Sequence, residues 1–202
     1  MIHRMKIKPH ERGLLFREGE PIAVLQPGVH WYLDPLLKLR LQIVSPRNPW
    51  LVHNDLELIV KSGILGNEAV VLDLRDHERA LVWIDKRFAA IMEEGLYVLW
   101  TTDHEVRVEV LDARPMQLLH ADLPVIVRSS RAAALLEVLN VEPGHAGLWF
   151  RDGAYQATLE PGTYAFWKGV GKLKLYDVDL RELVLDVSGQ DIMTADKVTL
   201  RL

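Results

Sequence analysis

One stretch of the sequence is nearly repeated further along, and the spacing constrains the fold more than any other feature. HERGLLF begins at His10, and HERALVW begins at His77, 67 residues later. The same offset applied again reaches GHAGLWF, which begins at Gly144. Three units of this length fill almost all of the 202 residues. Self-similarity at a fixed spacing is the signature of a repeated structural unit, so we predict three tandem β-rich modules at 1–67, 68–134 and 135–202.

The content of each unit predicts strands. Apolar and polar residues alternate over 37–43 and again over 106–110, and this two-residue period is typical of a half-buried strand. The apolar and aromatic segments at 13–17, 80–84 and 147–151 suit a preceding strand of the same sheet. We therefore predict a mainly β (α+β) fold, with about four or five strands in each module.

A glycine holds the same position in all three units, as Gly28, Gly95 and Gly162. Pro27 and Pro161 precede two of them. Proline followed by glycine supplies a φ near −65° and then a positive φ, which is typical of a type II turn. We expect a structural turn at each glycine.

The first two units end in HNDLELIV and HADLPVIV, where an aspartate precedes apolar residues at helical spacing. We predict that Asp55 and Asp122 are the N-caps of short helices that close these modules. His53 and His120 stand just before the predicted caps. A local turn role is a better interpretation for both histidines than metal ligation.

The repeated His-Glu-Arg motif has two interpretations, a catalytic cluster or a polar turn before a strand. The third unit carries Gly144–His145–Ala146 at the same position. A turn with polar side chains explains all three units, so we favour the structural interpretation.

Other sequence patterns give no active site. The eight histidines form no HExxH motif, the serines lack a G-x-S-x-G context, and KGVGKLK lacks the following helix of a phosphate loop. Trp100 and Trp167 are equivalent in the repeat, which predicts core packing or a contact between modules. We expect no catalytic, cofactor-binding or metal-ligating residues, no small-molecule substrate and no enzymatic activity.

Charge and cysteine content narrow the class of protein further. A net charge of −4 gives no basic footprint for nucleic acid. Cysteine is absent, which excludes disulfides and thiolate metal sites and suits a reducing compartment. The N-terminal stretch lacks the apolar run of a secretory signal, and no segment approaches the ~20 apolar residues of a spanning helix. These features predict a soluble, cytoplasmic chain.

The third unit ends differently, in VDLRELVLDVSGQDIMTADKVTLRL. With the Pro161–Gly162 turn before it, this stretch resembles the start of the band-7 or SPFH domain of the stomatin/prohibitin/flotillin family, over roughly 137–202 of this sequence. The branch it resembles is the bacterial slipins with tandem β modules ahead of the domain. The positions that match the family motif are Asp179, Arg181, Gln190, Thr194, Asp196 and Val198.

The resemblance implies a non-enzymatic scaffold that forms homo-oligomeric rings or cages, often peripheral to a membrane. Any membrane association is expected through regions outside these residues. A band-7 domain continues well beyond KVTLRL, so we favour a fragment over a short protein that keeps only the beginning. The alternative function is a binding module that recognises a protein or peptide through its β repeats.

Overall fold

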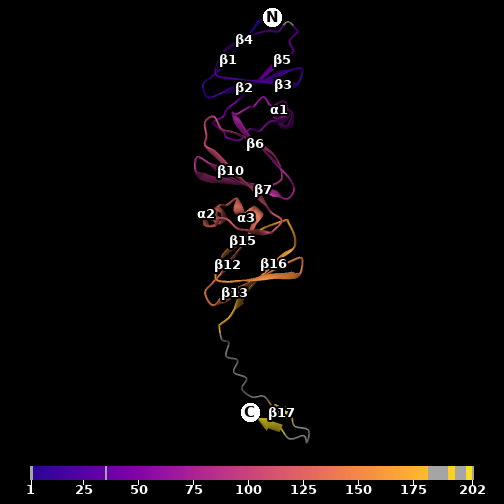
Figure 1. Cartoon of the computed structure of the whole chain (residues 1–202), viewed down its shortest axis with the longest axis vertical. Helices are drawn as coiled ribbons and strands as arrows, with labels where there is room; N and C mark the ends of the chain where they lie inside the picture. The colour runs from indigo at the N-terminus through magenta and orange to yellow at the C-terminus, as the bar shows by residue number, and fades with distance from the viewer. Residues whose placement is uncertain (1, 35, 182–190, 194–198, 202) are drawn as a thin grey trace. The chain divides into compact units, whose positions relative to one another are not determined.

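The computed structural model describes residues 2–34, 36–181, 191–193 and 199–201. Strands dominate, with a few short helices between them (Figure 1), so the predicted mainly β class is confirmed. Contacts group the chain into two units, one of Met1–Val138 with Tyr164–Gly171 and one of Leu139–Thr163 with Lys172–Leu202. The boundaries of these two units differ from those of the three predicted modules. The three modules therefore stay a prediction.

The first repeat contains two small antiparallel sheets. β1 pairs with β4, and β2 lies between β3 and β5. A helix, α1, follows the sheets. The bounds are β1 Ile2–Ile7, β2 Arg12–Arg17, β3 Glu20–Leu25, β4 Gly28–Leu33, β5 Leu39–Val44 and α1 Leu56–Ser62.

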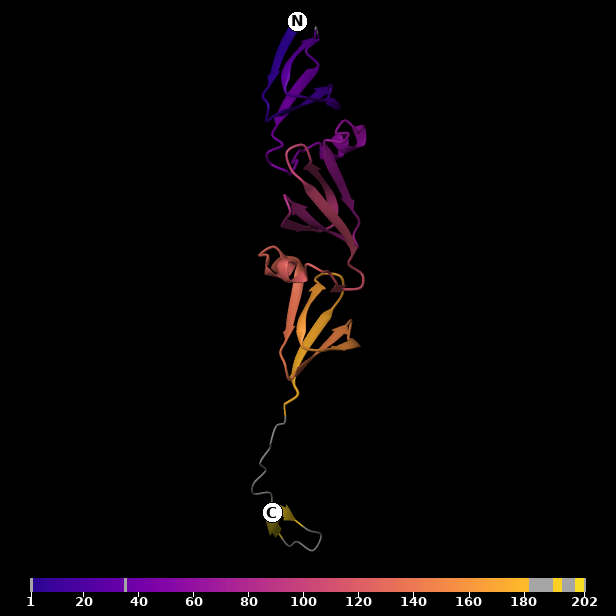
Figure 2. The ribbon, with the colours of Figure 1, turned by 60° about the vertical axis from the view of Figure 1, so that its left-hand side comes forward.

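The second repeat has the same order and pairing. β6 pairs with β9, and β7 lies between β10 and β8 (Figure 2). Two short helices follow a two-residue strand. The bounds are β6 Ala69–Leu74, β7 Glu78–Ile84, β8 Arg87–Met92, β9 Gly95–Trp100, β10 Val106–Asp112, β11 Gln117–Leu118, α2 Leu123–Arg128 and α3 Ala132–Leu135.

In the third repeat, β13 lies between β14 and β16, and β15 lies between β11 and β12. The bounds are β12 Leu136–Val141, β13 His145–Arg151, β14 Ala154–Leu159, β15 Gly162–Trp167 and β16 Leu173–Asp179. The first residues of β1, β6 and β12 are again 67 positions apart. The strands expected over 37–43 and 106–110 correspond to β5 and β10.

The C-terminal end contains one more described pair, β17 (Asp191–Met193) with β18 (Thr199–Arg201). Four residues of the predicted family motif, Gln190, Thr194, Asp196 and Val198, lie outside the described residues. Within the part that the structure describes, no helix has the length and apolar character needed to cross a membrane.

In each repeat a two-residue turn joins the central strand of one three-stranded sheet, β2, β7 or β13, to the next strand along the chain. Both turn residues have positive φ in every repeat: 52° and 91° at Glu18–Gly19, 51° and 65° at Asp85–Lys86, and 51° and 86° at Asp152–Gly153. Positive φ at both central positions is typical of the type I′ hairpin, whose twist matches that of the strands. The sequence prediction missed all three turns, although Asp152–Gly153 is a pair that type I′ turns favour; only Asp85–Lys86 has no glycine.

The turn predicted at the three repeated glycines differs from a type II turn. Gly28, Gly95 and Gly162 have φ values of 147°, 138° and 159°, far above the value near 80° of a type II turn. Each is the first residue of a strand, β4, β9 or β15. The position still needs glycine, because side-chain-bearing residues rarely adopt such φ values.

The predicted caps hold the right positions with a different hydrogen-bonding role. Asp55 and Asp122 immediately precede α1 and α2, but neither side chain makes a capping hydrogen bond. Their backbone carbonyls accept the first helical bonds instead, from Ile59 at 3.0 Å and from Ile126 at 3.1 Å. The carboxylates of Asp55 and Asp122 therefore do not cap the helices, although the sequence predicts that they would.

Two apolar clusters link successive repeats within the larger unit. One joins Leu14 and Phe16 of β2 and Ile59 of α1 to Val98 and Trp100 of β9. The other joins their equivalents 67 residues later, which are Leu81, Trp83, Ile126, Ala165 and Trp167. Trp100 and Trp167 are each 1% exposed. The predicted burial of these two tryptophans is confirmed.

Candidate functional site

The most developed surface site is built on the second repeat, where adjacent strands place three large side chains side by side. Trp83 of β7 is directly opposite Arg107 of β10 and Phe88 of β8 in the strand register. Side chains that face each other across antiparallel strands lie on the same face of the sheet. The sheet therefore forms a floor of two aromatic rings and one guanidinium.

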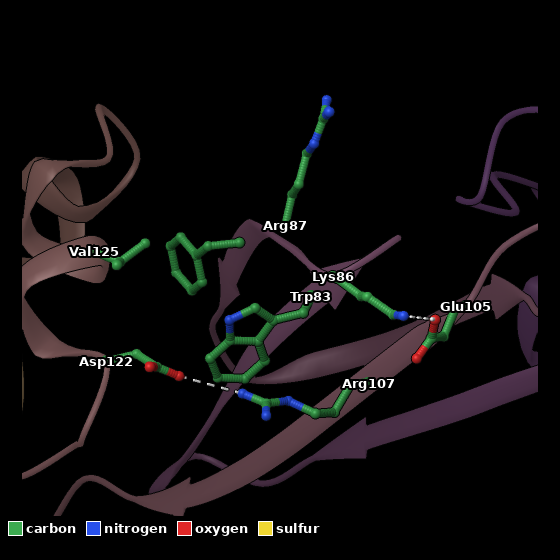
Figure 3. Close-up of a pocket in the computed structure, with 8 residues that line it drawn as sticks. Trp83, Lys86, Arg87, Glu105, Arg107, Asp122 and Val125 are labelled. Carbon is green, nitrogen blue, oxygen red and sulfur yellow. Dashed lines mark hydrogen bonds and ion pairs between the residues drawn. The ribbon is translucent and has the colours of Figure 1, made fainter.

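Arg107 fixes this floor to the N-terminal end of α2. Its guanidinium carbon lies 3.9 Å from the centre of the Trp83 ring, and a guanidinium nitrogen lies 3.4 Å from Asp122 Oδ2 (Figure 3). Phe88 meets Trp83 edge to face, with ring centroids 5.6 Å apart. A cation over an aromatic face is attracted by the ring quadrupole, so Arg107 stabilises the packing of the helix on the sheet.

His120 completes the local structure. Its ring stacks on Trp83 with centroids 5.5 Å apart, and its Nδ1 accepts a hydrogen bond from the backbone N–H of Asp122 at 2.9 Å. An accepting Nδ1 assigns the ring proton to Nε2, which lies 3.2 Å from Glu109 Oε2 and donates to it.

The first repeat has the same arrangement. His53 stacks on Phe16, accepts from the backbone N–H of Asp55 at 2.9 Å, and bonds to Gln42 through Nε2. The predicted local turn role of His53 and His120 is confirmed. Both imidazoles shape the segment that leads into a helix.

Above this floor lies an open hollow of about 530 Å³. Its lining combines aromatic, apolar and charged side chains, namely Trp83, Lys86, Arg87, Phe88, Glu105, Arg107, Asp122 and Val125. Figure 3 shows Arg87 extending away from the other labelled side chains. Lys86 faces Glu105 at 3.8 Å. The hollow can contact an apolar or aromatic side chain, but its charged groups include no nucleophile paired with a base.

The corresponding region of the first repeat is smaller and more polar. It is a hollow of about 310 Å³ lined by Arg40, Gln42, Val52, His53, Asn54 and Asp55. Among the residues that the structure describes, no three histidine or acidic side chains are grouped so that they could hold a metal ion.

The repeated His-Glu-Arg motif has a structural role in its contacts. Glu11 and Glu78 each accept a hydrogen bond from a backbone N–H three residues earlier, at 3.0 and 2.9 Å. Arg12 pairs with Glu68 at 2.8 Å, and Arg79, which is 8% exposed, pairs with Glu94 at 3.0 Å. The two glutamate bonds close a turn before β2 and before β7, as the structural interpretation predicts, and the two arginines tie these turns to Glu68 and Glu94 elsewhere in the chain.

Asp179 and Arg181, two residues of the predicted family motif, form a side-chain pair. Arg181 donates from Nε to Asp179 Oδ1 at 2.8 Å and from a terminal nitrogen to Oδ2 at 2.7 Å. Asp112 and Arg114 form the same forked pair one repeat earlier. The arginine bonds lower the pKa of Asp112 to about 2 and also lower the pKa of Asp179. In both repeats the pair ends the long strand, β10 or β16.

His104 connects the second repeat to the first. Its Nδ1 lies 2.8 Å from Asp85 Oδ2, and its Nε2 lies 3.1 Å from the carbonyl oxygen of Arg47. Both neighbours are acceptors, so the charged ring with two N–H groups satisfies them best. The bond to Asp85 raises the pKa of His104 above its ordinary 6.5, and the bond to His104 lowers the pKa of Asp85.

The raised pKa of His104 predicts a pH-dependent contact between the repeats. Its stabilisation is fully present below the unfolded pKa of 6.5 and is lost as pH rises through the folded pKa. We expect the urea midpoint to fall as pH rises above about 6.5, and the fall to shrink in His104→Gln. NMR titration of the ring and urea melts measure both effects. An unchanged pH profile in the variant would contradict this assignment.

Comparison with known proteins returned no match, whether to models of protein families, to curated proteins or to solved structures. The site therefore rests on its own geometry. Sequence reasoning singled out Asp122 as a helix cap but did not predict that Trp83, Arg107 and Phe88 lie together on one face of the sheet. The available signal was positional, because Trp83 and Phe88 stand on either side of the Asp85–Lys86 turn that joins β7 to β8.

Proposed function

We propose that this chain is an assembly module of a non-enzymatic scaffold of the band-7 type. In that role, the tandem repeats set the distance and orientation between other parts of an assembly. The proposal keeps the resemblance of the third repeat to the start of a band-7 domain, whose motif includes Asp179 and Arg181. Their forked pair also occurs at Asp112 and Arg114 in the second repeat, so it is a feature of the module. A carboxylate and an arginine two residues apart close the end of a strand.

The observation that carries the proposal is the repetition of the apolar clusters between modules. The same positions form both clusters: an aliphatic and an aromatic residue of β2 or β7, an isoleucine of the helix, and the end of β9 or β15. In repeat proteins each unit is stabilised mainly by its neighbours. Among the described residues, the two largest fully buried side chains, Trp100 and Trp167, lie at these junctions, which suits a chain that holds other parts of an assembly at a fixed spacing.

The hollow on the second repeat supports a second candidate function, a binding module. Val125 is 55% exposed beside the aromatic floor, so an apolar side chain of a peptide could lie against Val125 and Phe88. Arg107 and His120 already occupy contacts with Trp83. The hollow therefore offers a shallow contact, which fits a docking point within an assembly.

The scaffold function is tested by sedimentation velocity on two proteins. One is the 202-residue chain, and the other is this chain followed by the remainder of a band-7 domain with its coiled coil. We expect the 202-residue chain to be monomeric or weakly associating, and the extended chain to form large closed oligomers. Stable closed oligomers of the short chain would place the assembly surface in the repeats, and monomers in both cases would contradict the proposal.

A further inference from the structure

The outer face of the β1–β4 ribbon combines exposed apolar residues with basic ones. Val29, Trp31 and Leu33 of β4 are 45%, 64% and 74% exposed. Alternate residues of a strand lie on one face, so the three form an apolar row. Lys6 is opposite Val29 and Arg4 is opposite Trp31 in the register. The Arg4 guanidinium carbon lies 5.8 Å from the centre of the Trp31 ring.

The loop that follows β4 adds two leucines to this row. Leu36 and Leu37 are 69% and 67% exposed. Asp34, which is 6% exposed, holds the loop by accepting hydrogen bonds from the backbone N–H groups of Lys38 at 3.1 Å and Leu39 at 2.8 Å. Leu37 has a φ of 54°, an uncommon conformation for a residue with a side chain. A buried carboxylate thus fixes a conformation that leaves both leucines in solvent.

The second repeat shows what covers the same strand face inside the chain. Val98 and Trp100, the equivalents of Trp31 and Leu33, are each 1% exposed because β2 and α1 of the preceding repeat pack on them. The ribbon of the first repeat therefore has an apolar face of the kind that the fold otherwise buries.

The loop after β4 indicates that the apolar face of the β1–β4 ribbon binds something other than another repeat. The second repeat has Asp103 and His104 where the first has Leu36 and Leu37, and His104 bonds to the Arg47 carbonyl of its neighbour. Two leucines cannot make such bonds. The first ribbon and its loop are thus suited to an apolar medium, whereas the loop of the second repeat suits the polar edge of a neighbouring module.

The net charge of the first repeat indicates the charge of the surface that it would bind. Residues 1–40 contain seven lysines and arginines and four acidic residues, a net charge of +3, within a chain whose net charge is −4. The remaining residues therefore carry a net charge of −7. Arg4 and Lys6 are both exposed beside the apolar row. An occupant with an apolar interior and an anionic surface complements this arrangement.

We propose that the lipid-facing surface, defined as Arg4, Lys6, Val29, Trp31, Leu33, Leu36 and Leu37, binds the headgroup region of an anionic lipid bilayer. Tryptophan is favoured at the boundary between headgroups and acyl chains. The leucines enter the acyl boundary, and the two basic side chains contact lipid phosphates. This surface is independent of the scaffold function, because it lies within the first repeat and needs no assembly.

The test uses the 202-residue chain and sedimented vesicles of phosphatidylcholine, alone or mixed with phosphatidylglycerol. We expect binding to the mixed vesicles that weakens as salt is added. Arg4→Gln and Lys6→Gln should each lower the partition coefficient about fivefold. The combined Leu36→Ser and Leu37→Asn variant should lower it on the order of a hundredfold. Asparagine is chosen at residue 37 because it tolerates positive φ.

Leu119→Ser is the matched control. Leu119 is 77% exposed but lies in the second repeat, so this change removes an equally exposed leucine and should leave the partition coefficient unchanged. Circular dichroism melts of all variants check that each is folded. An equal loss in Leu119→Ser would mean that binding depends on general surface hydrophobicity and would overturn the proposal.

Trp31 provides a direct readout of depth. The other five tryptophans are buried or half-buried, so brominated lipids should quench mainly Trp31, and Trp31→Phe should abolish that quenching. Absence of binding to the mixed vesicles would overturn the proposal. So would sedimentation velocity that shows a dimer which Trp31→Ser dissociates, because a second copy would then be the occupant of this face.

Discussion

Trp100→Ala is expected to lower the free energy of unfolding by roughly 3–5 kcal/mol, the range typical of removing a large buried aromatic side chain. Trp100 is 1% exposed and packs in the cluster that contains Phe16 and Ile59 of the first repeat. The indole therefore stabilises the contact between two repeats as well as its own sheet. Truncation leaves a cavity that the paired strands β6 and β9 cannot close by simple collapse.

The repeat itself supplies the matched control for this variant. Leu33 is equivalent to Trp100 in the first repeat but is 74% exposed, so Leu33→Ala should change the stability by less than about 0.5 kcal/mol. Urea unfolding followed by tryptophan fluorescence and by circular dichroism measures both variants. If the two probes give different midpoints for Trp100→Ala, the first two repeats unfold separately once their junction is weakened. Similar losses in the two variants would show that the cluster does not stabilise the junction.

The sequence predicts the repeat and the strand pattern well because both depend on local periodicity. A two-residue alternation around Leu39 or Val106 indicates a strand without any tertiary information. The same alternation cannot say what buries a given side chain. Leu33 and Trp100 occupy one register position, yet one is solvent-exposed and the other is enclosed by a neighbouring repeat. That difference depends on whether another repeat packs on the strand, which the periodicity of the sequence does not show.

The turns and helix caps differ from prediction because contacts with other parts of the chain fix the backbone there in place of the predicted residues. His53 and His120 accept the N–H groups of Asp55 and Asp122, so the segment before each helix is already fixed without a side-chain cap. The Asp85–Lys86 hairpin adopts positive φ at two residues without glycine, because the pairing of β7 with β8 imposes the turn. In both cases tertiary context determines a local conformation that the propensities of the residues do not predict.

The hollow around Trp83 could be predicted only in part. Asp122 stands out in the sequence as a residue before a predicted helix, whereas Trp83 is one residue of the strand predicted at 80–84. Arg107 joins them through the strand register and a contact of 3.9 Å to the indole. Nothing in the spacing of these residues gives that register, since it depends on the length of both β8 and β9 and on the pairing of β10 with β7.

Gly95→Val is expected to destabilise the second repeat by about 1–3 kcal/mol. Gly95 begins β9 with a φ of 138°, a conformation that a β-branched residue adopts only with strain. A Cβ built at this position would also lie 3.3 Å from the hydroxyl oxygen of Tyr97. Relief of the strain requires rotation of the backbone, which would disturb the pairing of Gly95 with Leu74 at the end of the β6–β9 ribbon.

Leu96→Val is the control for that change, because it introduces the same side chain one residue later in β9, where the backbone is ordinary strand. It should cost less than about 1.5 kcal/mol, as for a conservative apolar substitution. Thermal and urea melts of the two variants separate backbone strain from the effect of a valine in this strand. A Gly95→Val variant as stable as Leu96→Val would mean that β9 can begin with an ordinary φ, and the glycine at this position of the repeat would then have no conformational reason. A loss of stability in Gly95→Val above the expected range would mean that the strain also disturbs the junction between the repeats. The same strand carries Val98 and Trp100 into the cluster with the first repeat.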